Sequence, residues 1–203
     1  MQAVQEKVPS ISLRERKRAE TRTRVHDAAM ALFARQGFEA TTLDDIATAA
    51  GVSRRSLFHY FVSKEDIVLS AKAGLGDLLA AAVSRRPAQE PLMVMAENAL
   101  TDMATDFQGP GPRALARLIH DTPSLHAGDQ AKYEALETRL ALALATRKGL
   151  SPDDLQTRVV ATTAVGIMRM ATQSWLAADD ALGPEVHGKA AFDALRQTLA
   201  NRP

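Results

Sequence analysis

The sequence predicts an all-α protein of about nine helices, in which a small N-terminal domain precedes a larger helical one. Apolar residues make up 46% of the 203 positions, and most are Ala, Leu, Val or Met, which favour helices over strands. Prolines are absent between Pro9 and Pro87 but then recur at helix-length intervals, where each can mark a loop or a first turn. These features favour helices joined by short connections.

Composition excludes several classes of function. The chain has no Cys, which rules out disulfides, thiolate zinc sites and cysteine nucleophiles. It shows neither a signal peptide nor 18 successive apolar residues, so we expect a soluble cytoplasmic protein that does not enter a membrane. The net charge of +1 conceals an asymmetry, because residues 1–64 hold 11 Lys and Arg against 7 Asp and Glu. A basic end on a mildly acidic body is typical of a DNA-binding module on a helical scaffold.

A flexible arm and a first helix are expected at the start of the chain. Residues 1–11 contain Pro9 and no helical periodicity. Ser12 and Glu15 then form a capping box, in which each side chain satisfies a free backbone N–H at the helix start. The helix is expected to end at Gly37. Its apolar face is formed by Val25, Ala28, Ala29, Leu32 and Phe33.

Three more helix starts follow closely. A second capping box at Thr42 begins a short helix that ends at Gly51, and Ser53 caps the next helix. A longer helix is expected from Ser63 to Ala82, because its apolar residues keep a helical period. The later helices are expected at about residues 91–107, 112–121, 124–148, 152–177 and 185–201.

The two short helices have the layout of a helix-turn-helix. Glycine in the connection, residues 50–53, permits a tight turn, and the second helix would enter the major groove of DNA. Arg54 and Arg55 occupy the first turn of that helix, and an arginine can bond guanine through two donors at once. The spacing of Leu57 and Phe61 places them on the core side instead.

Short motifs between Arg14 and Val68 make this prediction more specific. They are Ala31-Leu32-Phe33, Gly37-Phe38, Thr41-Thr42-Leu43-Asp44-Asp45-Ile46-Ala47, Ala50-Gly51-Val52-Ser53 and Leu57-Phe58-His59-Tyr60-Phe61-Val62-Ser63-Lys64-Glu65-Asp66. In these motifs the segment resembles the TetR family of bacterial repressors, over about the first third of the chain. The resemblance implies a three-helix DNA-binding domain at residues 12–64 and a ligand-binding and dimerisation domain at residues 65–203.

The resemblance also implies a set of DNA contacts. The side chains facing the groove would be Arg54, Arg55, Ser56 and Phe58. Phosphates would be contacted from Thr42, Ser53, His59, Tyr60 and Lys64. The family often has tyrosine in place of Phe58 and a small residue in place of Arg55. The consecutive arginines predict a half-site that contains guanine.

Five basic residues of the first helix leave two interpretations open. They form either a solvated helix face or a set of loose phosphate contacts. These residues are Arg16, Lys17, Arg18, Arg22 and Arg24.

The helix expected at 152–177 is apolar on more than one side, so both of its faces must be covered. One cover is its own domain and the other is naturally a second subunit, although a buried central helix in a monomer is the alternative. The resemblance implies that the last two helices pair with their symmetry mates in a four-helix bundle. The interface residues expected on these helices are Val160, Ile167, Ala191, Leu195 and Leu199.

The helices between 91 and 177 also supply candidates for a small-molecule pocket, because they combine apolar bulk with a few polar tips. The same residue types fill ordinary cores, which is the alternative at every position. The candidates are Met93, Met103, Phe107, His120, Tyr133, Met168 and Trp175. His120 and His126 lie six apart around Pro123 without a metal-binding pattern, and no metal site is predicted.

The sequence shows no nucleophile with its base, paired carboxylates, metal cluster or nucleotide loop, so we predict neither catalytic residues nor a cofactor. We expect a repressor that binds double-stranded DNA at a palindromic operator as a homodimer and is released by an unknown small-molecule effector. The alternative is an activator, or another DNA-binding protein without an effector.

Overall fold

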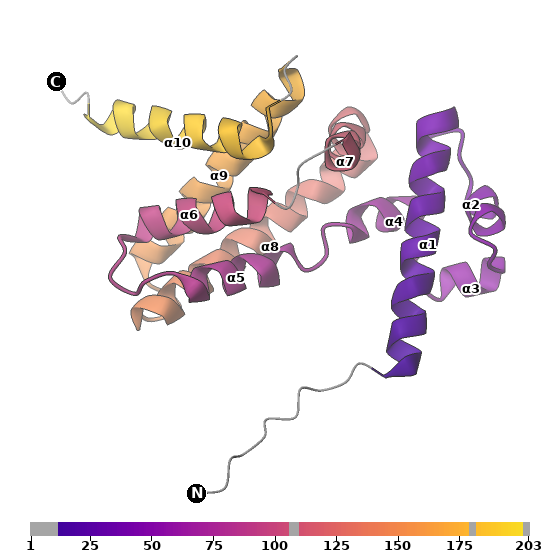
Figure 1. The fold of residues 1–203 in the computed structure, drawn as a ribbon, viewed down its shortest axis with the longest axis horizontal. Helices are drawn as coiled ribbons and strands as arrows, with labels where there is room; N and C mark the ends of the chain where they lie inside the picture. The colour runs from indigo at the N-terminus through magenta and orange to yellow at the C-terminus, as the bar shows by residue number, and fades with distance from the viewer. Residues whose placement is uncertain (1–11, 106–109, 179–181, 201–203) are drawn as a thin grey trace, which may run out of the picture. The chain divides into compact units, whose positions relative to one another are not determined.

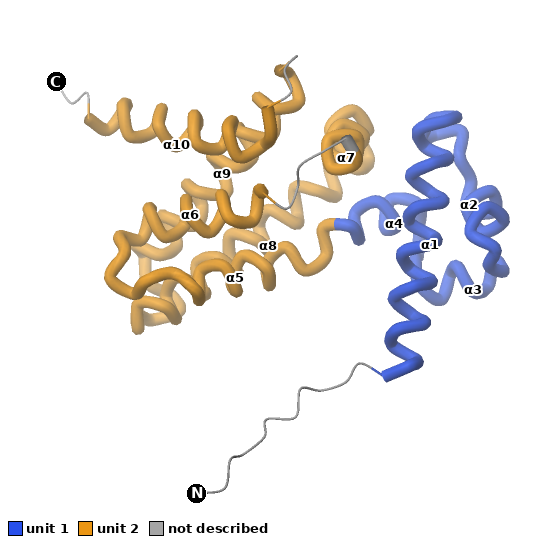
Figure 2. The backbone as a smooth tube through the Cα atoms, viewed as in Figure 1, with its two compact units in different colours: residues 1–71 blue, residues 72–203 orange. Residues whose placement is uncertain are grey.

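The computed structural model in Figure 1 describes residues 12–105, 110–178 and 182–200. Ten helices and no strand occur in this part of the chain, which confirms the all-α class. The chain divides into two compact units, residues 1–71 and 72–203, drawn in two colours in Figure 2.

The first unit has one long helix and three short ones. Ser12 and Thr42 form the two predicted capping boxes, with Glu15 and Asp45 respectively. Ser63 also caps the helix that follows it, through its side chain. The helices are α1 (Leu13–Gln36), α2 (Leu43–Ala49), α3 (Arg54–Phe58) and α4 (Lys64–Ser70). The buried side chains that join them are Val25, Ala29, Leu32 and Phe33 of α1, Ile46 of α2, Leu57 of α3, Phe61, and Ile67 and Val68 of α4.

The single helix expected from Ser63 to Ala82 is wrong, because the chain turns between residues 71 and 74. Gly74 has a φ of 88°, a left-handed conformation that favours glycine. α4 packs on α1 and belongs to the first unit, which therefore ends at residue 71 instead of the expected 64. The break also accounts for the tenth helix among the described residues, where about nine helices were expected.

By length and composition alone, the stretch Lys64–Arg85 is apolar enough to cross a membrane, with a mean hydropathy of 1.5. Core helices of proteins outside membranes have the same length and composition. The turn at residues 71–74 interrupts the stretch, and both of its helices contribute buried side chains to a core.

In its described residues, the second unit contains six helices around one apolar core. α8 and α9 are the two longest, α5 and α6 pack beside them, and α10 lies across α9 and α6 (Figure 1). The helices are α5 (Leu75–Arg85), α6 (Leu92–Ala104), α7 (Pro110–Asp121), α8 (Pro123–Lys148), α9 (Leu155–Ala177) and α10 (Pro184–Ala200). The largest core side chains are Leu79, Met95, Leu100, Met103, Leu136, Leu140, Leu144, Ile167 and Phe192.

Two arginines of α7 hold the C-terminal end of α9. Arg113 donates to the carbonyl of Trp175 at 3.0 Å and to that of Ala178, and Arg117 donates to Leu176 O at 2.6 Å. The last carbonyls of a helix lack partners within the helix. A positive charge at this end also interacts favourably with the negative end of the helix dipole. The arginines therefore fix α7 against this end of α9.

A buried ion pair joins the start of the second unit to α8. Nζ of Lys72 donates to both carboxylate oxygens of Asp129, at 2.7 and 2.9 Å, and the Asp129 side chain is only 7% exposed. The Tyr133 ring lies beside the pair, with Lys72 Nζ 5.5 Å and the Arg169 guanidinium carbon 5.2 Å from its centroid. Burial, and then the Asp129 carboxylate, raise the pKa of Tyr133, so its hydroxyl stays protonated.

Lys64 has an intramolecular role in the first unit that the sequence did not predict. Its Nζ donates to the carbonyl oxygens of Phe38 at 2.9 Å and Glu39 at 3.4 Å. The same ammonium lies 4.3 Å from the centroid of the Phe38 ring. Lys64 thus ties the first turn of α4 to the connection between α1 and α2.

Replacing this lysine tests its structural role. We expect Lys64→Met to lower the free energy of unfolding by about 1–2 kcal/mol, because methionine keeps the apolar stem but loses hydrogen bonds to a charged group. Thermal unfolding followed by circular dichroism measures the change. The control Arg55→Met removes an exposed cation and should stay within about 0.5 kcal/mol of the parent. Equal stability of the two variants would contradict the role.

The buried pair gives a second stability prediction. Lys72→Met should destabilise the second unit by about 3 kcal/mol, because it leaves the Asp129 carboxylate buried without its ammonium partner. Fluorescence of Trp175, the single tryptophan in the sequence, follows the unfolding of this unit. The double variant Lys72→Met/Asp129→Leu should recover most of the loss, and a double variant no more stable than the single one would reject this account.

Candidate nucleic-acid interface

The connection between α2 and α3 forms the tight turn that a helix-turn-helix needs. Gly51 has a φ of 64°, and Val52 N–H donates to Ala47 O at 3.0 Å. The Ser53 hydroxyl then accepts from the backbone N–H of Ser56 at 3.1 Å, which caps α3. Leu57 and Phe61 are fully buried, as their spacing predicted.

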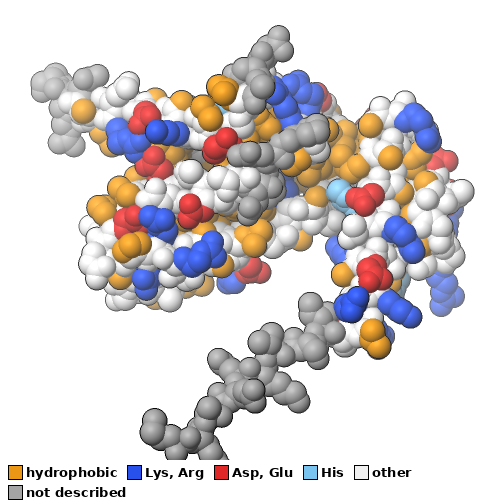
Figure 3. Space-filling view, in the orientation of Figure 1, with side chains coloured by type: hydrophobic (Ala, Val, Ile, Leu, Met, Phe, Trp, Pro, Cys, Tyr) orange, Lys and Arg blue, Asp and Glu red, His pale blue; other side chains and the backbone are white. Residues whose placement is uncertain are grey.

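The outward side of α3 presents the residues expected to face DNA. Arg54, Arg55 and Phe58 are exposed, whereas Ser56 is half-buried. α3 ends at Phe58, and the chain turns through the next two residues. Basic and acidic side chains are interspersed over the first unit on the face drawn in Figure 3.

The two adjacent arginines differ in their surroundings. Nη1 of Arg54 donates to Oδ2 of Asp44 at 2.9 Å, and its guanidinium carbon lies 5.6 Å from the centroid of the Phe58 ring. Arg55 makes no hydrogen bond, ion pair or ring contact within the described residues. The sequence pattern did not reveal the pair, because it joins two helices across the turn.

The phosphate candidates also differ from one another. The backbone N–H and hydroxyl of Thr42 both donate to Oδ2 of Asp45, at 3.0 and 2.7 Å, and these hydrogen bonds hold the pKa of Asp45 below its ordinary value. The Thr42 hydroxyl is therefore engaged within the capping box. Ser53 and His59 are exposed, and Lys64 is engaged with the connection after α1.

The structure also places two basic residues of α1 beside Tyr60, which is half-buried. The Arg18 guanidinium carbon lies 6.0 Å from the centroid of the Tyr60 ring. Arg22 donates to Tyr60 O at 3.4 Å, and its guanidinium carbon lies 4.7 Å from the centroid of the Phe61 ring. Sequence alone did not distinguish these two from the other basic residues of the helix, since their contacts depend on the chain after α3.

Most of the residues expected to bind a ligand lie in or against the core of the second unit. Met103 is buried within that core, and Met93, Tyr133 and Met168 pack against it. Trp175 is buried at the end of α9, where its indole N–H donates to Leu182 O at 3.0 Å. His120 is exposed, with its Nδ1 2.8 Å from the Asp121 carboxylate, so it does not join the others. Phe107 lies outside the described residues.

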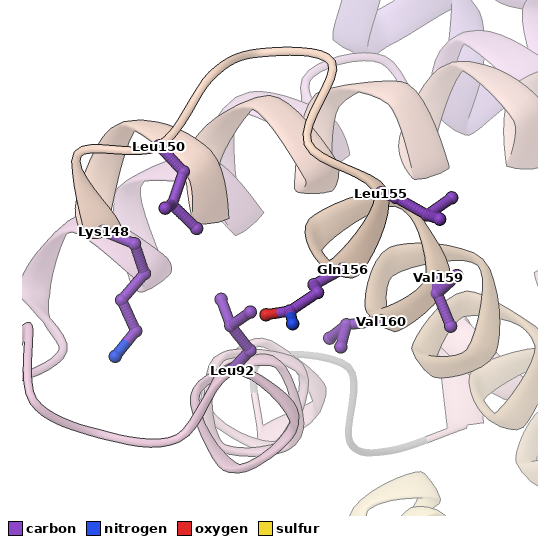
Figure 4. Close-up of a pocket in the computed structure, with 7 residues that line it drawn as sticks. All are labelled: Leu92, Lys148, Leu150, Leu155, Gln156, Val159 and Val160. Atoms are coloured by element: carbon purple, nitrogen blue, oxygen red, sulfur yellow. The ribbon is translucent and has the colours of Figure 1, made fainter.

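Two hollows on the second unit contain none of these candidates. The larger one, of about 750 Å³, has Leu92 and Gln156 facing one another across it (Figure 4). Its lining consists of Leu92, Lys148, Leu150, Leu155, Gln156, Val159 and Val160. The smaller one, of about 360 Å³, is lined by Ala80, Ser84, Arg139, Leu142, Ala143, Thr146 and Arg147.

The residues expected at a dimer interface mostly face the protomer's own core. Ile167 lies in that core, Val160, Ala191 and Leu195 pack against it, and only Leu199 is exposed. The outer face of α9 instead exposes other large apolar side chains. They are Leu155 at 70%, Val159 at 56% and Met170 at 65%. Because α9 is apolar around its circumference, periodicity did not show which stripe it buries.

Comparisons with known proteins agree with this architecture. Residues 25–71 match the family described as bacterial regulatory proteins, tetR family, and residues 90–200 match the MftR C-terminal domain. The HTH-type transcriptional regulator TcmR of Streptomyces glaucescens is 34% identical over 198 residues, which cover 92% of this chain and 88% of TcmR. MftR of Mycobacterium tuberculosis is 32% identical over 187 residues, which cover 89% of this chain and 91% of MftR.

A solved structure shows the same fold. It is the Thermus thermophilus TetR family transcriptional repressor FadR in complex with lauroyl-CoA, which superposes with a TM-score of 0.56 at 24% identity and covers 90% of this chain and 96% of FadR. The family matches cover both units, and the curated relatives are regulators instead of enzymes. The chain therefore belongs to the tetR family of bacterial regulatory proteins and is a transcriptional regulator, not an enzyme.

Proposed function

We propose that this protein is a cytoplasmic repressor that binds a palindromic operator as a homodimer and leaves it when a small molecule binds the second unit. The observation that carries the proposal is the capped α3, whose first turn exposes Arg54 and Arg55 on a unit separate from the large helical one. FadR is one family member that is described as a transcriptional repressor and was solved in complex with a small molecule, lauroyl-CoA.

In this proposal Arg54, Arg55, Ser56 and Phe58 contact bases. An arginine reads guanine with two donors, and an aromatic ring can touch a thymine methyl group. The positioning contacts to phosphate come from the start of α2 at Thr42, the start of α3 at Ser53, and His59 and Tyr60. Lys64 supports them by holding the connection that leads into α2.

The exposed apolar stripe of α9 is the face that we assign to dimerisation. Val186, near the start of α10, is another exposed apolar side chain. Leu199 belongs to the same proposal, whereas Val160, Ile167, Ala191 and Leu195 support the stripe from the core side. Two protomers would bury this apolar surface and read two half-sites with one twofold axis.

The effector site is proposed among Met93, Met103, Tyr133, Met168 and Trp175, which combine apolar bulk with the polar ends of Tyr133 and Trp175. In one arrangement of the dimer, the two DNA-binding units would be too far apart to contact both half-sites. A ligand that binds this arrangement more tightly would increase its population and so release the protein from DNA. The alternative function, an activator or a DNA-binding protein without an effector, is distinguished by whether any small molecule releases the operator complex.

Binding selection from random duplexes tests the base-reading assignment. We expect guanine in each half-site, and Arg55→Ala should reduce discrimination at one base of each half-site by about tenfold. His59→Ala should weaken binding to all duplexes alike, since phosphates carry no sequence information. An equal loss of discrimination in both variants, or half-sites of A·T pairs only, would contradict the assignment.

Sedimentation tests the dimer face. Val159→Glu and Met170→Glu should convert a micromolar dimer into monomers, because a charge would be buried without a partner at the interface. The control Leu142→Glu alters an exposed leucine of α8 and should remain a dimer. Dimers that survive both α9 substitutions would rule out this face.

A further inference from the structure

The ion pair between Arg54 and Asp44 lies on the surface proposed to read DNA. Its side chains are 65% and 60% exposed, and exposed pairs of this kind contribute little to stability. The Phe58 ring lies 5.6 Å from the same guanidinium carbon, so Arg54 is held between a carboxylate of α2 and a ring of its own helix. The pair is therefore expected to affect DNA recognition more than stability.

The position of the carboxylate defines what it does to the two arginines. Residues 54 and 58 are one helical turn apart and share a face of α3, whereas Arg55 points about 100° away and has no such partner. A guanidinium has five N–H donors in a planar fork. The Asp44 contact uses Nη1 and leaves other donors available, so it orients the fork without blocking it.

A carboxylate beside DNA also acts on the rest of the interface. DNA phosphates repel it, and this repulsion is the same for every sequence. When the correct base is present, contacts from the oriented Arg54 offset the repulsion. When the base is wrong, the repulsion remains and Arg54 is restrained from reaching a phosphate instead. Such an arrangement lowers affinity for wrong sequences more than for the right one.

We propose that Asp44 is a specificity-determining positioning residue. It orients the Arg54 guanidinium for base contact, and its charge lowers the affinity for DNA sequences in which Arg54 finds no matching base. The inference rests on the proposed DNA-binding function. It assigns unequal roles to the adjacent arginines. Arg54 contacts its base with a guanidinium held by Asp44 and Phe58, whereas Arg55 contacts its base with a side chain that no other described residue holds.

The experiment uses the full-length chain and the substitution Asp44→Asn, which keeps the shape of the side chain and removes its charge. Affinity is measured for a duplex obtained by binding selection and for a scrambled duplex of the same composition, over a series of salt concentrations. We expect affinity for the scrambled duplex to rise, and the ratio of the two affinities to fall about tenfold. The log–log salt dependence for the scrambled duplex should steepen by about 1 per protomer.

Two further variants make the result specific. Glu20→Gln removes an exposed carboxylate of α1 that contacts no arginine within the described residues, and should leave the affinity ratio within about twofold of the parent. Asp44→Glu keeps the charge and should retain most of the discrimination. A ratio that falls equally in Glu20→Gln would show an effect of net charge alone and overturn the proposal.

Other outcomes separate this inference from the proposed function. An unchanged ratio and salt slope in Asp44→Asn, with a parent protein that discriminates, would reject the role of Asp44 alone. Loss of affinity for both duplexes together with a lower melting temperature would show a structural brace and also reject it. A parent protein that prefers no duplex would reject the proposed function itself.

Discussion

The surface proposed to read DNA depends on helices that are too short to persist alone. α2, α3 and α4 have 7, 5 and 7 residues, whereas isolated helices below about 12 residues are marginal in water. Side chains at Thr42, Ser53 and Ser63 satisfy their first-turn N–H groups, and burial of Ile46 and Leu57 fixes the inner faces of α2 and α3. The helices that carry the outward side chains therefore keep defined positions because their inward side chains are packed.

The second unit meets a different constraint, since α9 carries apolar residues on all sides. Its inner stripe belongs to the core through Ile167, and its outer stripe is exposed at Val159 and Met170. Arg113 and Arg117 bond the last carbonyls of the helix, so α7 and α9 are coupled at this end. One helix thus connects the core, the exposed apolar face and the candidate ligand residues Met168 and Trp175, so it would couple the proposed effector site to the proposed dimer face.

Helix starts were predictable from the sequence, whereas features that depend on packing between helices were not. Capping residues act within three positions of themselves, so Ser12 and Thr42 identified helix starts that the structure confirms. The break before Gly74 was missed because the apolar period continues across it. The stripe that α9 buries was missed because its period has no polar side to orient it. The pair of Arg54 with Asp44 was not predictable, since it requires the packing of α2 beside α3.

The separation of inner and outer faces on α3 has an evolutionary consequence. Stability rests on the buried Leu57, whereas Arg55 contributes only to the solvent-facing side. Substitutions at exposed positions without partners usually change stability by no more than about 0.5 kcal/mol. Under the proposed reading of DNA by α3, a duplicated copy of this gene could drift at position 55 toward a new target sequence while the fold is maintained. Under the proposed role of Asp44, position 54 would have to change together with it.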